Sequence, residues 1–294
     1  MATPYNPTIY DLCRTALRRA GQPSPSDGMI GDAIHNAFQE VKNDIKLNCP
    51  THPLLETNEM TVTVVGVPEY TQPSTVNVLK SLILYSGSDD ARGTVSGFTG
   101  TAPSVTNIFL EAKTSALGSS YLIGKRLFLL TSTGALQHSY IVSLSFDSAG
   151  ISPVMAVEPG GSTTYLVADN REELYDSGRQ QLQYDRTEWA TKGLPKCGAL
   201  DGETFYMNVP PDKVYPLIWT YYQDIDQMDE DSSTFTKILR EWRNIFVEGV
   251  TAKSMVLYDD NRQYEHIKIY QYMIDRLRAE TISFTQTVPY DPIY

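Results

Sequence analysis

Residues 232–279 read SSTFTKILREWRNIFVEGVTAKSMVLYDDNRQYEHIKIYQYMIDRLRA, and this stretch decides the expected fold. Its apolar residues recur at intervals of three and four, which is the pattern of one buried helix face. A polar break at 258–261 (YDDN) divides the pattern into two runs. We therefore predict two long helices, antiparallel or bent at the break, that anchor a helical core. The core positions on these helices are Phe235, Leu239, Trp242, Phe246, Tyr270 and Ile274.

The composition indicates a globular protein. The 294 residues suit either one large domain or two, and the hydrophobic content of 41% is enough for a buried core. The formal net charge is −11. This acidic excess argues against ordinary binding of duplex DNA, which depends on Lys and Arg at the phosphates. It is compatible with a surface past which DNA slides.

The three cysteines, Cys13, Cys49 and Cys197, are far apart and odd in number. We therefore expect no disulfide framework and a reducing compartment. The first seven residues have neither the charged nor the apolar region of a secretory signal. The apolar runs are interrupted within about ten residues, short of the roughly 20 that a membrane-spanning helix needs. We expect a soluble protein with no membrane partner.

Two amphipathic helices are predicted within residues 1–56. The first begins at 8–11 (TIYD), which resembles a capping box, and ends before Gly21 and Pro23. The second runs from Ser26 to about Leu47, and the following Cys-Pro-Thr-His-Pro sequence stops it.

Residues 57–167 change to short β-branched runs separated by Gly, Ser, Asp and Pro. This spacing predicts an antiparallel sandwich or barrel inserted between helical parts. Residues 94–106 are rich in Gly, Ser and Thr and are expected to form a loop. Strands are expected at 60–65, 76–85, 108–110, 126–131, 139–144 and 153–157.

Residues 168–282 are predicted to complete the helical part. A weak helix is expected over 171–183. Strands at 204–208 and 215–223, joined by Pro-Pro-Asp, are expected to form a β hairpin before the two long helices. The expected fold class is therefore α+β, a helical bundle with an inserted β module and a hairpin.

The densest acidic cluster is interpreted as a solvated loop that caps a helix, because carboxylates favour the positive end of a helix dipole. It lacks the central Gly and closing Glu of an EF-hand calcium loop. The cluster consists of Asp224, Asp226, Asp229, Glu230 and Asp231.

Other sites of chemistry are equally unsupported. Cys49 and His52 are the only Cys/His pair at ligand spacing, and they lack a second pair, so a structural turn is favoured over zinc. The sequence has neither a nucleophile elbow nor a phosphate-binding loop. We predict no catalytic residues, no cofactor and no metal. Carboxylates that meet only in space leave a hydrolase of cell-envelope polymer as an open alternative.

Several stretches resemble one family. Residues 121–127 (YLIGKRL) and 131–137 (TSTGALQ) resemble a β module found in many phage neck and tail proteins, although 136–139 (LQHS) departs from its usual Gly-Gln-x-Arg. Residues 204–212 (TFYMNVPPD) are similar to the hairpin before the last helices of phage head-to-tail adaptors, and 8–12 (TIYDL) matches their N-terminal helix.

This family includes tail tubular protein A of short-tailed phages. The resemblance implies a structural protein of the virion neck, assembled in the host cytoplasm, without enzyme activity. It also implies a homo-oligomeric ring of twelve copies beneath the portal protein, joined to the tail nozzle or tail tube. Such a ring extends the channel for double-stranded DNA and helps to retain the genome.

Residues 283–294 are expected to form an extended arm that docks on the portal by strand addition. The alternative is a frayed terminus. The proposed docking residues are Phe284, Val288, Pro289, Tyr290, Ile293 and Tyr294. A second functional hypothesis is a virion binding module whose β insert holds a glycan or another tail protein.

Overall fold

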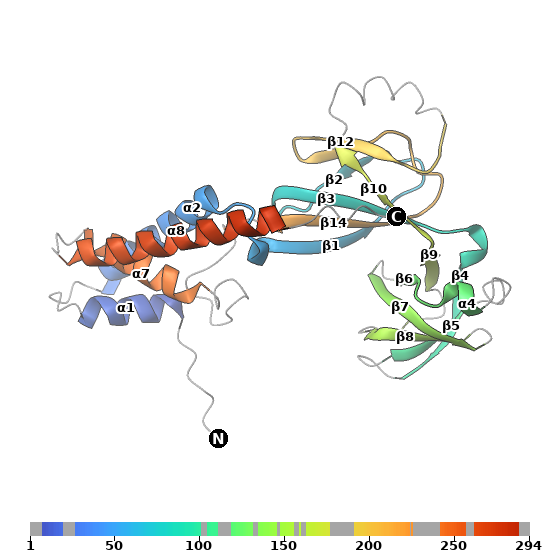
Figure 1. The fold of residues 1–294 in the computed structure, drawn as a ribbon, viewed down its shortest axis with the longest axis horizontal. Helices are drawn as coiled ribbons and strands as arrows, with labels where there is room; N and C mark the ends of the chain where they lie inside the picture. Colours follow the sequence, from blue (N-terminus) through green and yellow to red (C-terminus); the bar gives the residue numbers. More distant parts are fainter. Residues whose placement is uncertain are drawn as a thin grey trace. The chain divides into compact units, whose positions relative to one another are not determined.

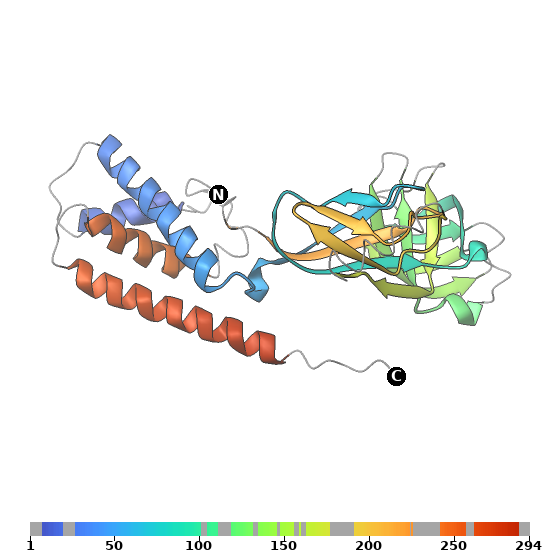
Figure 2. The ribbon, with the colours of Figure 1, turned by 90° about the horizontal axis from the view of Figure 1, so that it is seen from above.

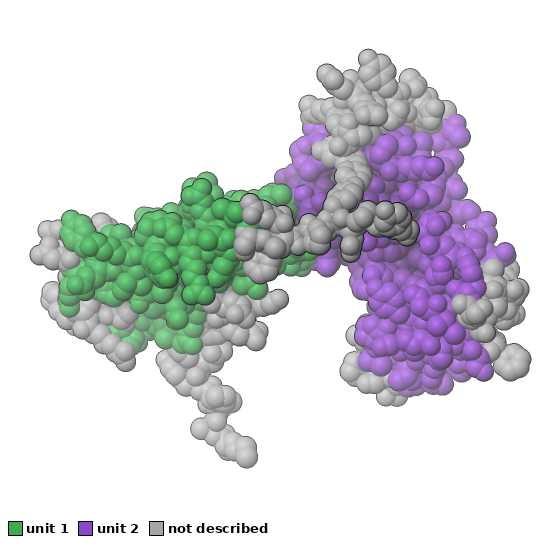
Figure 3. All heavy atoms as spheres, viewed as in Figure 1, with its two compact units in different colours: residues 1–57, 75–78, 221–294 green, residues 58–74, 79–220 purple. Residues whose placement is uncertain are grey.

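The computed structural model describes most of the 294 residues and divides the chain into two compact units (Figure 3). The helical unit comprises residues 1–57, 75–78 and 221–294, and the sheet unit comprises 58–74 and 79–220. The described residues are 8–19, 27–100, 105–110, 119–131, 135–145, 148–155, 159, 163–176, 191–223, 225, 242–256 and 262–287.

In its described residues, the helical unit is built from four helices that share one core (Figures 1 and 2). Both N-terminal helices are present as predicted, and the two C-terminal helices pack along each other. The helices are α1 (Ile9–Arg19), α2 (Asp27–Asn48), α7 (Arg243–Val256) and α8 (Gln263–Thr287). Three short helices occur elsewhere in the described chain: η1 (Pro53–Leu55), η2 (Asp89–Ala91) and α4 (Ser119–Leu122).

Apolar residues at helical spacing explain why these helices pack. Phe38 of α2 and Phe246 of α7 are both fully buried, and their rings stack with centroids 5.1 Å apart. On α8, Tyr270, Ile274 and Leu277 form one buried stripe, as expected for residues three and four apart on a helix. Full burial of each large apolar side chain contributes about 1.5–3 kcal/mol.

Gly249 allows the closest approach between three of these helices. A Cβ atom added there would lie 2.6 Å from Tyr270 Cε2 on α8 and 2.8 Å from Val41 Cγ2 on α2. Both distances are shorter than van der Waals contact, so only glycine fits at this position of α7. The close packing of α2, α7 and α8 therefore requires a residue without a side chain at position 249.

The strands form two open sheets and one closed barrel (Figure 1). The first sheet has the order β1 (Glu56–Val62), β14 (Pro216–Gln223), β3 (Val76–Ser86), β10 (Asn170–Glu173). The second has the order β11 (Tyr175–Asp176), β12 (Cys197–Asp201), β13 (Thr204–Met207), β2 (Glu69–Thr71). The barrel closes in the order β4 (Arg92–Thr99), β5 (Val105–Leu110), β8 (Ser148–Met155), β7 (Leu136–Ser145), β6 (Arg126–Leu130), β9 (Thr164–Ala168).

The expected class is confirmed as mixed α+β, with a closed six-stranded barrel and C-terminal helices. Alternation along β6 shows how the barrel is filled: Leu127 and Leu129 belong to the interior cluster, whereas Phe128 belongs to a cluster outside it. Successive side chains of a strand point to opposite faces. Each β6 residue thus contributes either to the barrel interior or to its outer wall.

Residues 94–106 were predicted to be a loop, and most of that prediction is wrong. Strand β4 pairs with β5 on one side and with β9 on the other, so it is the strand that closes the barrel. Gly97 lies against the ring of Phe109, where an added Cβ would be 3.1 Å from Cδ2. Strand partners on both sides here override the low strand propensity of Gly and Ser.

The helix predicted over 171–183 is wrong in its first part, because Arg171 and Glu172 lie in β10 opposite Tyr85 and Leu84 of β3. Residues 177–183 lie outside the described residues. The sheet unit continues to residue 220, whereas the sequence placed the end of the β module at 167.

The predicted hairpin of 204–208 with 215–223 is also wrong. Strand β13 pairs with β12 and β2, whereas β14 lies between β1 and β3 of the other sheet. The real hairpin joins β12 to β13, with Gly202 at φ 60° in the turn after Asp201. An Asp-Gly pair between two strand-like runs is a strong signal of a hairpin turn, so Asp201-Gly202 indicates this hairpin in the sequence.

Helix α8 extends through Thr287. The prediction of an extended arm beginning at residue 283 is therefore wrong for its first five residues, and Phe284 is helical. Residues 283–287 contain no proline, so nothing in this part of the sequence prevents the helix from continuing. No helix within the described parts of the chain has the length and apolar content needed to span a membrane.

Two helical glycines test the close packing at Gly249. We expect Gly249→Ala to lower the free energy of unfolding by about 1–2 kcal/mol, because overpacking outweighs the gain in helix propensity. Gly31→Ala on α2 is the matched control, since its Cβ would meet only Tyr10 Oη at 3.5 Å. That variant should gain about 0.5–1 kcal/mol. Urea unfolding followed by circular dichroism at 222 nm measures both, and equal shifts would contradict the close-packing role.

Candidate functional site

The core residues predicted from sequence lie together where the structure describes them. Trp242, Phe246, Tyr270 and Ile274 all belong to the core cluster of the helical unit. Phe235 and Leu239 lie outside the described residues, as does the acidic cluster at 224 and 226–231. Of the proposed portal-docking residues, Phe284 is in α8; Val288, Pro289, Tyr290, Ile293 and Tyr294 are outside the described residues.

Cys49 and His52 serve the turn after α2. Cys49 is fully buried in the helical core. Nδ1 of His52 accepts a hydrogen bond from the Leu54 N–H at 3.2 Å, and its ring meets Trp242 edge-on. Among the described residues, no group of three or more His, Cys, Asp or Glu side chains is arranged to hold a metal ion.

A polar network joins three helices above the Gly249 contact. The Tyr270 hydroxyl of α8 donates to Asp44 Oδ2 of α2 at 2.9 Å. Lys253 Nζ of α7 lies 2.9 Å from the same oxygen and 3.1 Å from Glu40 Oε2. A carboxylate that accepts from two helices at once fixes their register against the third.

Burial and charge shift the pKa of several groups in the helical unit. Burial raises the pKa of Tyr270, and the Asp44 carboxylate raises it further. Burial alone lowers the pKa of Lys253, but its hydrogen bonds to Asp44 and Glu40 outweigh this, so the pKa is raised overall. Burial also raises the pKa of the Cys13 thiol to about 12, with a contribution from Glu248.

Helix α8 also presents large apolar side chains to solvent. Two of them, Tyr264 and Ile267, follow the spacing that predicted a buried face, and that prediction is wrong for both. At about 100° per residue, Tyr264, Ile267 and Ile282 fall on one side of the buried stripe and Ile269 on the other, whereas Tyr272 lies on the outer face, nearly opposite the stripe. The exposed fraction is 62% for Tyr264 and 69% for Tyr272. Both flanks of α8 therefore carry uncovered apolar surface.

The sheet unit contains an apolar cavity of about 590 Å³. One wall comes from the barrel strands β4, β6, β7 and β9. The other comes from Val62 of β1, from Val214 and from Pro216, the first residue of β14. The lining residues are Val62, Arg92, Gly93, Thr94, Phe128, Leu130, Leu136, Thr164, Tyr165, Leu166, Val214 and Pro216.

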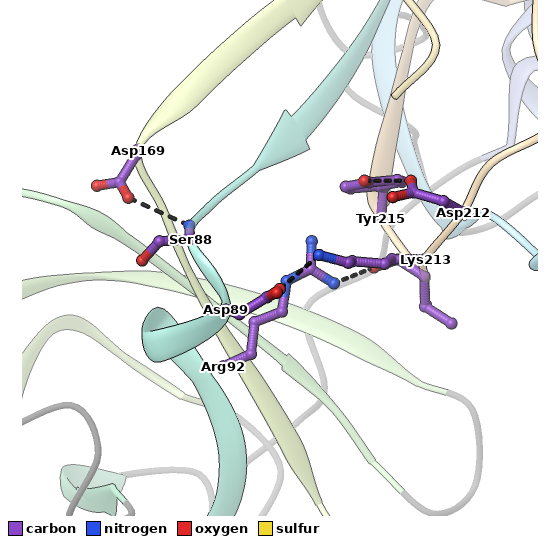
Figure 4. Close-up of polar contacts among 8 residues, drawn as sticks. Ser88, Asp89, Arg92, Asp169, Asp212, Lys213 and Tyr215 are labelled. Carbon is purple, nitrogen blue, oxygen red and sulfur yellow. Dashed lines mark hydrogen bonds and ion pairs between the residues drawn. The ribbon is translucent and has the colours of Figure 1, made fainter. Parts of the chain in front are cut away.

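Among the described residues, Arg92 is the only charged residue of this lining. Figure 4 shows its polar contacts. Its Nη1 donates to the Val214 carbonyl at 2.8 Å, and its guanidinium lies over the Tyr215 ring at 4.9 Å. Its Nε and Nη2 are buried and have no hydrogen-bond partner among the described residues. Burial lowers the pKa of Arg92, and nearby Tyr215, Asp89 and Asp212 oppose that shift. A buried guanidinium with spare donors favours a carboxylate.

Two further contacts hold the segment around Arg92 in place (Figure 4). Lys213 Nζ bonds Asp89 Oδ1 at 2.5 Å, and the Tyr215 hydroxyl donates to Asp212 Oδ1 at 2.6 Å. The first contact links η2, which directly precedes β4, to Lys213, and the second lies within residues 212–215. No sequence pattern marked Arg92 as part of a site, because its neighbours are distant along the chain.

Comparison with known proteins does not assign a family: no family model matches the chain, and no curated protein matches its sequence. The function must therefore be argued from the two surfaces described here, the flanks of α8 and the cavity beside Arg92.

The raised pKa values predict a helical unit that loses stability in alkali. A group whose pKa is higher in the folded than in the unfolded chain stabilises the fold fully below its unfolded pKa, and this contribution is lost as pH rises. Loss should begin near pH 9, the ordinary value for Cys13, and steepen above the ordinary values of 10.0 for Tyr270 and 10.5 for Lys253.

Tyr270→Phe isolates one contributor to this alkaline loss, because it keeps the buried ring and removes the hydroxyl. At neutral pH we expect it to lower the free energy of unfolding by about 1–3 kcal/mol, since Asp44 loses a donor. Between pH 10 and 11.5 the variant should lose less stability than the wild type. Urea unfolding across this range measures both effects. Identical pH profiles would contradict the assignment.

Proposed function

We propose that this chain is a structural virion protein that forms an adaptor ring between a phage portal and the tail. In this role the ring joins the portal to the tail nozzle or tail tube, extends the DNA channel and helps to retain the genome. It acts without catalysis, within the neck of the virion. The proposal rests on the sequence resemblance together with the surface of α8.

The observation that carries the proposal is the pair of apolar flanks on α8. A closed ring is built from heterologous contacts, in which one surface of each subunit meets a different surface of the next. A long helix with uncovered apolar residues on two sides offers two such surfaces. Burying Tyr264 or Tyr272 against a neighbour removes aromatic area from water, which is the main source of affinity at such contacts.

The core geometry also suits a ring subunit. Close packing at Gly249 and the Asp44 network hold α8 firmly against α2 and α7, so a neighbour meets a pre-ordered surface. Pre-ordering lowers the entropic cost of association. The net charge of −11 further suits a channel wall, because like charge keeps DNA from adhering.

The cavity beside Arg92 favours the second candidate, a binding module. In that role the sheet unit holds a glycan or another tail protein. A glycan array distinguishes these two ligands. Because the cavity is apolar, we expect no carbohydrate to bind, and this result would favour a protein ligand. The two functions are compatible, since the α8 flanks and the cavity are made of different residues.

Ring formation can be tested at Tyr272. The wild-type protein, mixed with purified portal rings, should add a second ring visible by negative-stain electron microscopy. Tyr272→Asp should reduce ring occupancy at least tenfold, because a charge would be buried at the contact. Tyr272→Phe retains the aromatic ring and should assemble as the wild type does.

The monomer stability of both Tyr272 variants should stay within about 0.5 kcal/mol of the wild type, because the side chain is exposed. Size-exclusion chromatography with light scattering checks the free state. A wild-type chain that stays monomeric on assembled portal rings, or equal assembly of both variants, would refute the proposed contact.

A further inference from the structure

We propose that the cavity beside Arg92 is a docking site for a polypeptide segment of a partner protein, one that carries a large apolar side chain next to a carboxylate. The site lies within the sheet unit and uses no residue of α8. It therefore stands or fails independently of ring formation.

The apolar part of the ligand follows from the cavity walls. Phe128, Leu136 and Leu166 on the barrel side face Val62 and Pro216 on the other. A volume of about 590 Å³ lies within the range typical of ligand pockets, roughly 300–1,000 Å³. Filling it with an aromatic or branched side chain removes apolar surface of both partners from water.

The negative charge of the ligand follows from the rim. Arg92 uses Nη1 for the Val214 carbonyl, and its other guanidinium nitrogens have no protein partner in the described chain. Lys213 is 41% exposed and pairs with the more exposed Asp89. Asp89 offsets the charge of Lys213, so it is the unpaired nitrogens of Arg92, a residue of the apolar lining, that orient an acidic-apolar ligand with its carboxylate toward Arg92.

Exposed valines next to the cavity favour a polypeptide over a small molecule. Val64, Val65 and Val67 in the β1–β2 connection are 55%, 44% and 40% exposed, and the cavity residue Val214 is 40% exposed. The Thr63 N–H donates to the Tyr215 carbonyl at 2.8 Å. Residues on either side of this pair, such as Val64 and Val214, therefore share a face. A small ligand would leave that face in water, whereas a segment crosses it.

The β1–β2 connection is rigid enough to serve as part of a docking surface. The Gly66 N–H donates to the Pro211 carbonyl at 2.8 Å, and the Val67 N–H to the Val64 carbonyl at 3.1 Å. The Val64 N–H donates to the Tyr70 hydroxyl at 2.9 Å, and Gly66 takes φ 80°, which glycine adopts without strain. These backbone groups already have hydrogen-bond partners within the protein, so the connection is ordered before binding. A partner would therefore contact mainly the exposed valine side chains.

The ligand class can be tested with two dyes of nearly the same ring system. 8-Anilinonaphthalene-1-sulfonate is anionic, and N-phenyl-1-naphthylamine is neutral. Both should bind the full-length protein with increased fluorescence. Arg92→Met should weaken the anionic dye about tenfold or more while changing the neutral dye less than about threefold.

Leu136→Trp is expected to fill the cavity and to weaken both dyes about tenfold. Lys213→Met provides a second charge variant that leaves the buried Arg92 contacts intact, and it should weaken the anionic dye alone. If each of these two variants weakened the anionic and the neutral dye by the same factor, the charged rim would be refuted. Unchanged dye binding in Leu136→Trp would refute the cavity as the site.

A peptide pair tests the polypeptide itself. The acetylated, amidated peptide Val-Phe-Asp-Val-Gly should displace the neutral dye at a concentration at least fivefold below that of its Asn counterpart. This difference should vanish in Arg92→Met. Replacing Val64 and Val65 by Ser should weaken the peptide and leave the dye unchanged. Equal displacement by both peptides, or full peptide affinity in the Val64/Val65 variant, would overturn the proposal.

Discussion

The helical unit depends on one contact, the placement of Tyr270 of α8 against the bare backbone of Gly249 of α7. The ring uses the space that a side chain would fill, and the hydroxyl reaches Asp44 of α2, where Lys253 also bonds. One residue thereby combines apolar burial with a charge-assisted hydrogen bond. Because the stripe through Tyr270 is buried, the remaining faces of α8 are presented outward, and these include the apolar flanks that we propose for ring contacts.

The sheet unit depends on a different constraint, the closure of the barrel by β4. Closing a sheet removes the unpaired edges that would otherwise invite association. The same strand begins with Arg92, so the residue that opens the closing strand also lies at the rim of the cavity. Alternation on β6 supplies the wall: inward leucines fill the barrel, and outward Phe128 faces the cavity. Barrel closure and cavity formation are two results of one strand arrangement.

Both proposed functions use apolar surface that the fold leaves uncovered. On α8 the exposed residues lie on a firmly packed helix, which suits contacts with identical neighbours. At the cavity they lie on a hydrogen-bonded loop beside a buried cation, which suits a partner with apolar and acidic groups. In both places the backbone is already ordered, so binding need not fix it at the time of contact. This ordered backbone at both surfaces suits the structural role that we propose.

The sequence alone determined the elements with a strong local period. The positions of α1 and α2, most of the buried positions on α7 and α8, and most barrel strands followed from spacing that depends only on neighbouring residues. Only the tertiary structure decided strand partners, because pairing joins residues far apart in the chain. It placed β13 away from β14, turned 94–99 into the strand that closes the barrel and made a strand at 170–173. The cavity beside Arg92 and, separately, the exposed face of α8 became candidate sites for the same reason, since burial and proximity are properties of the folded chain rather than of any local pattern.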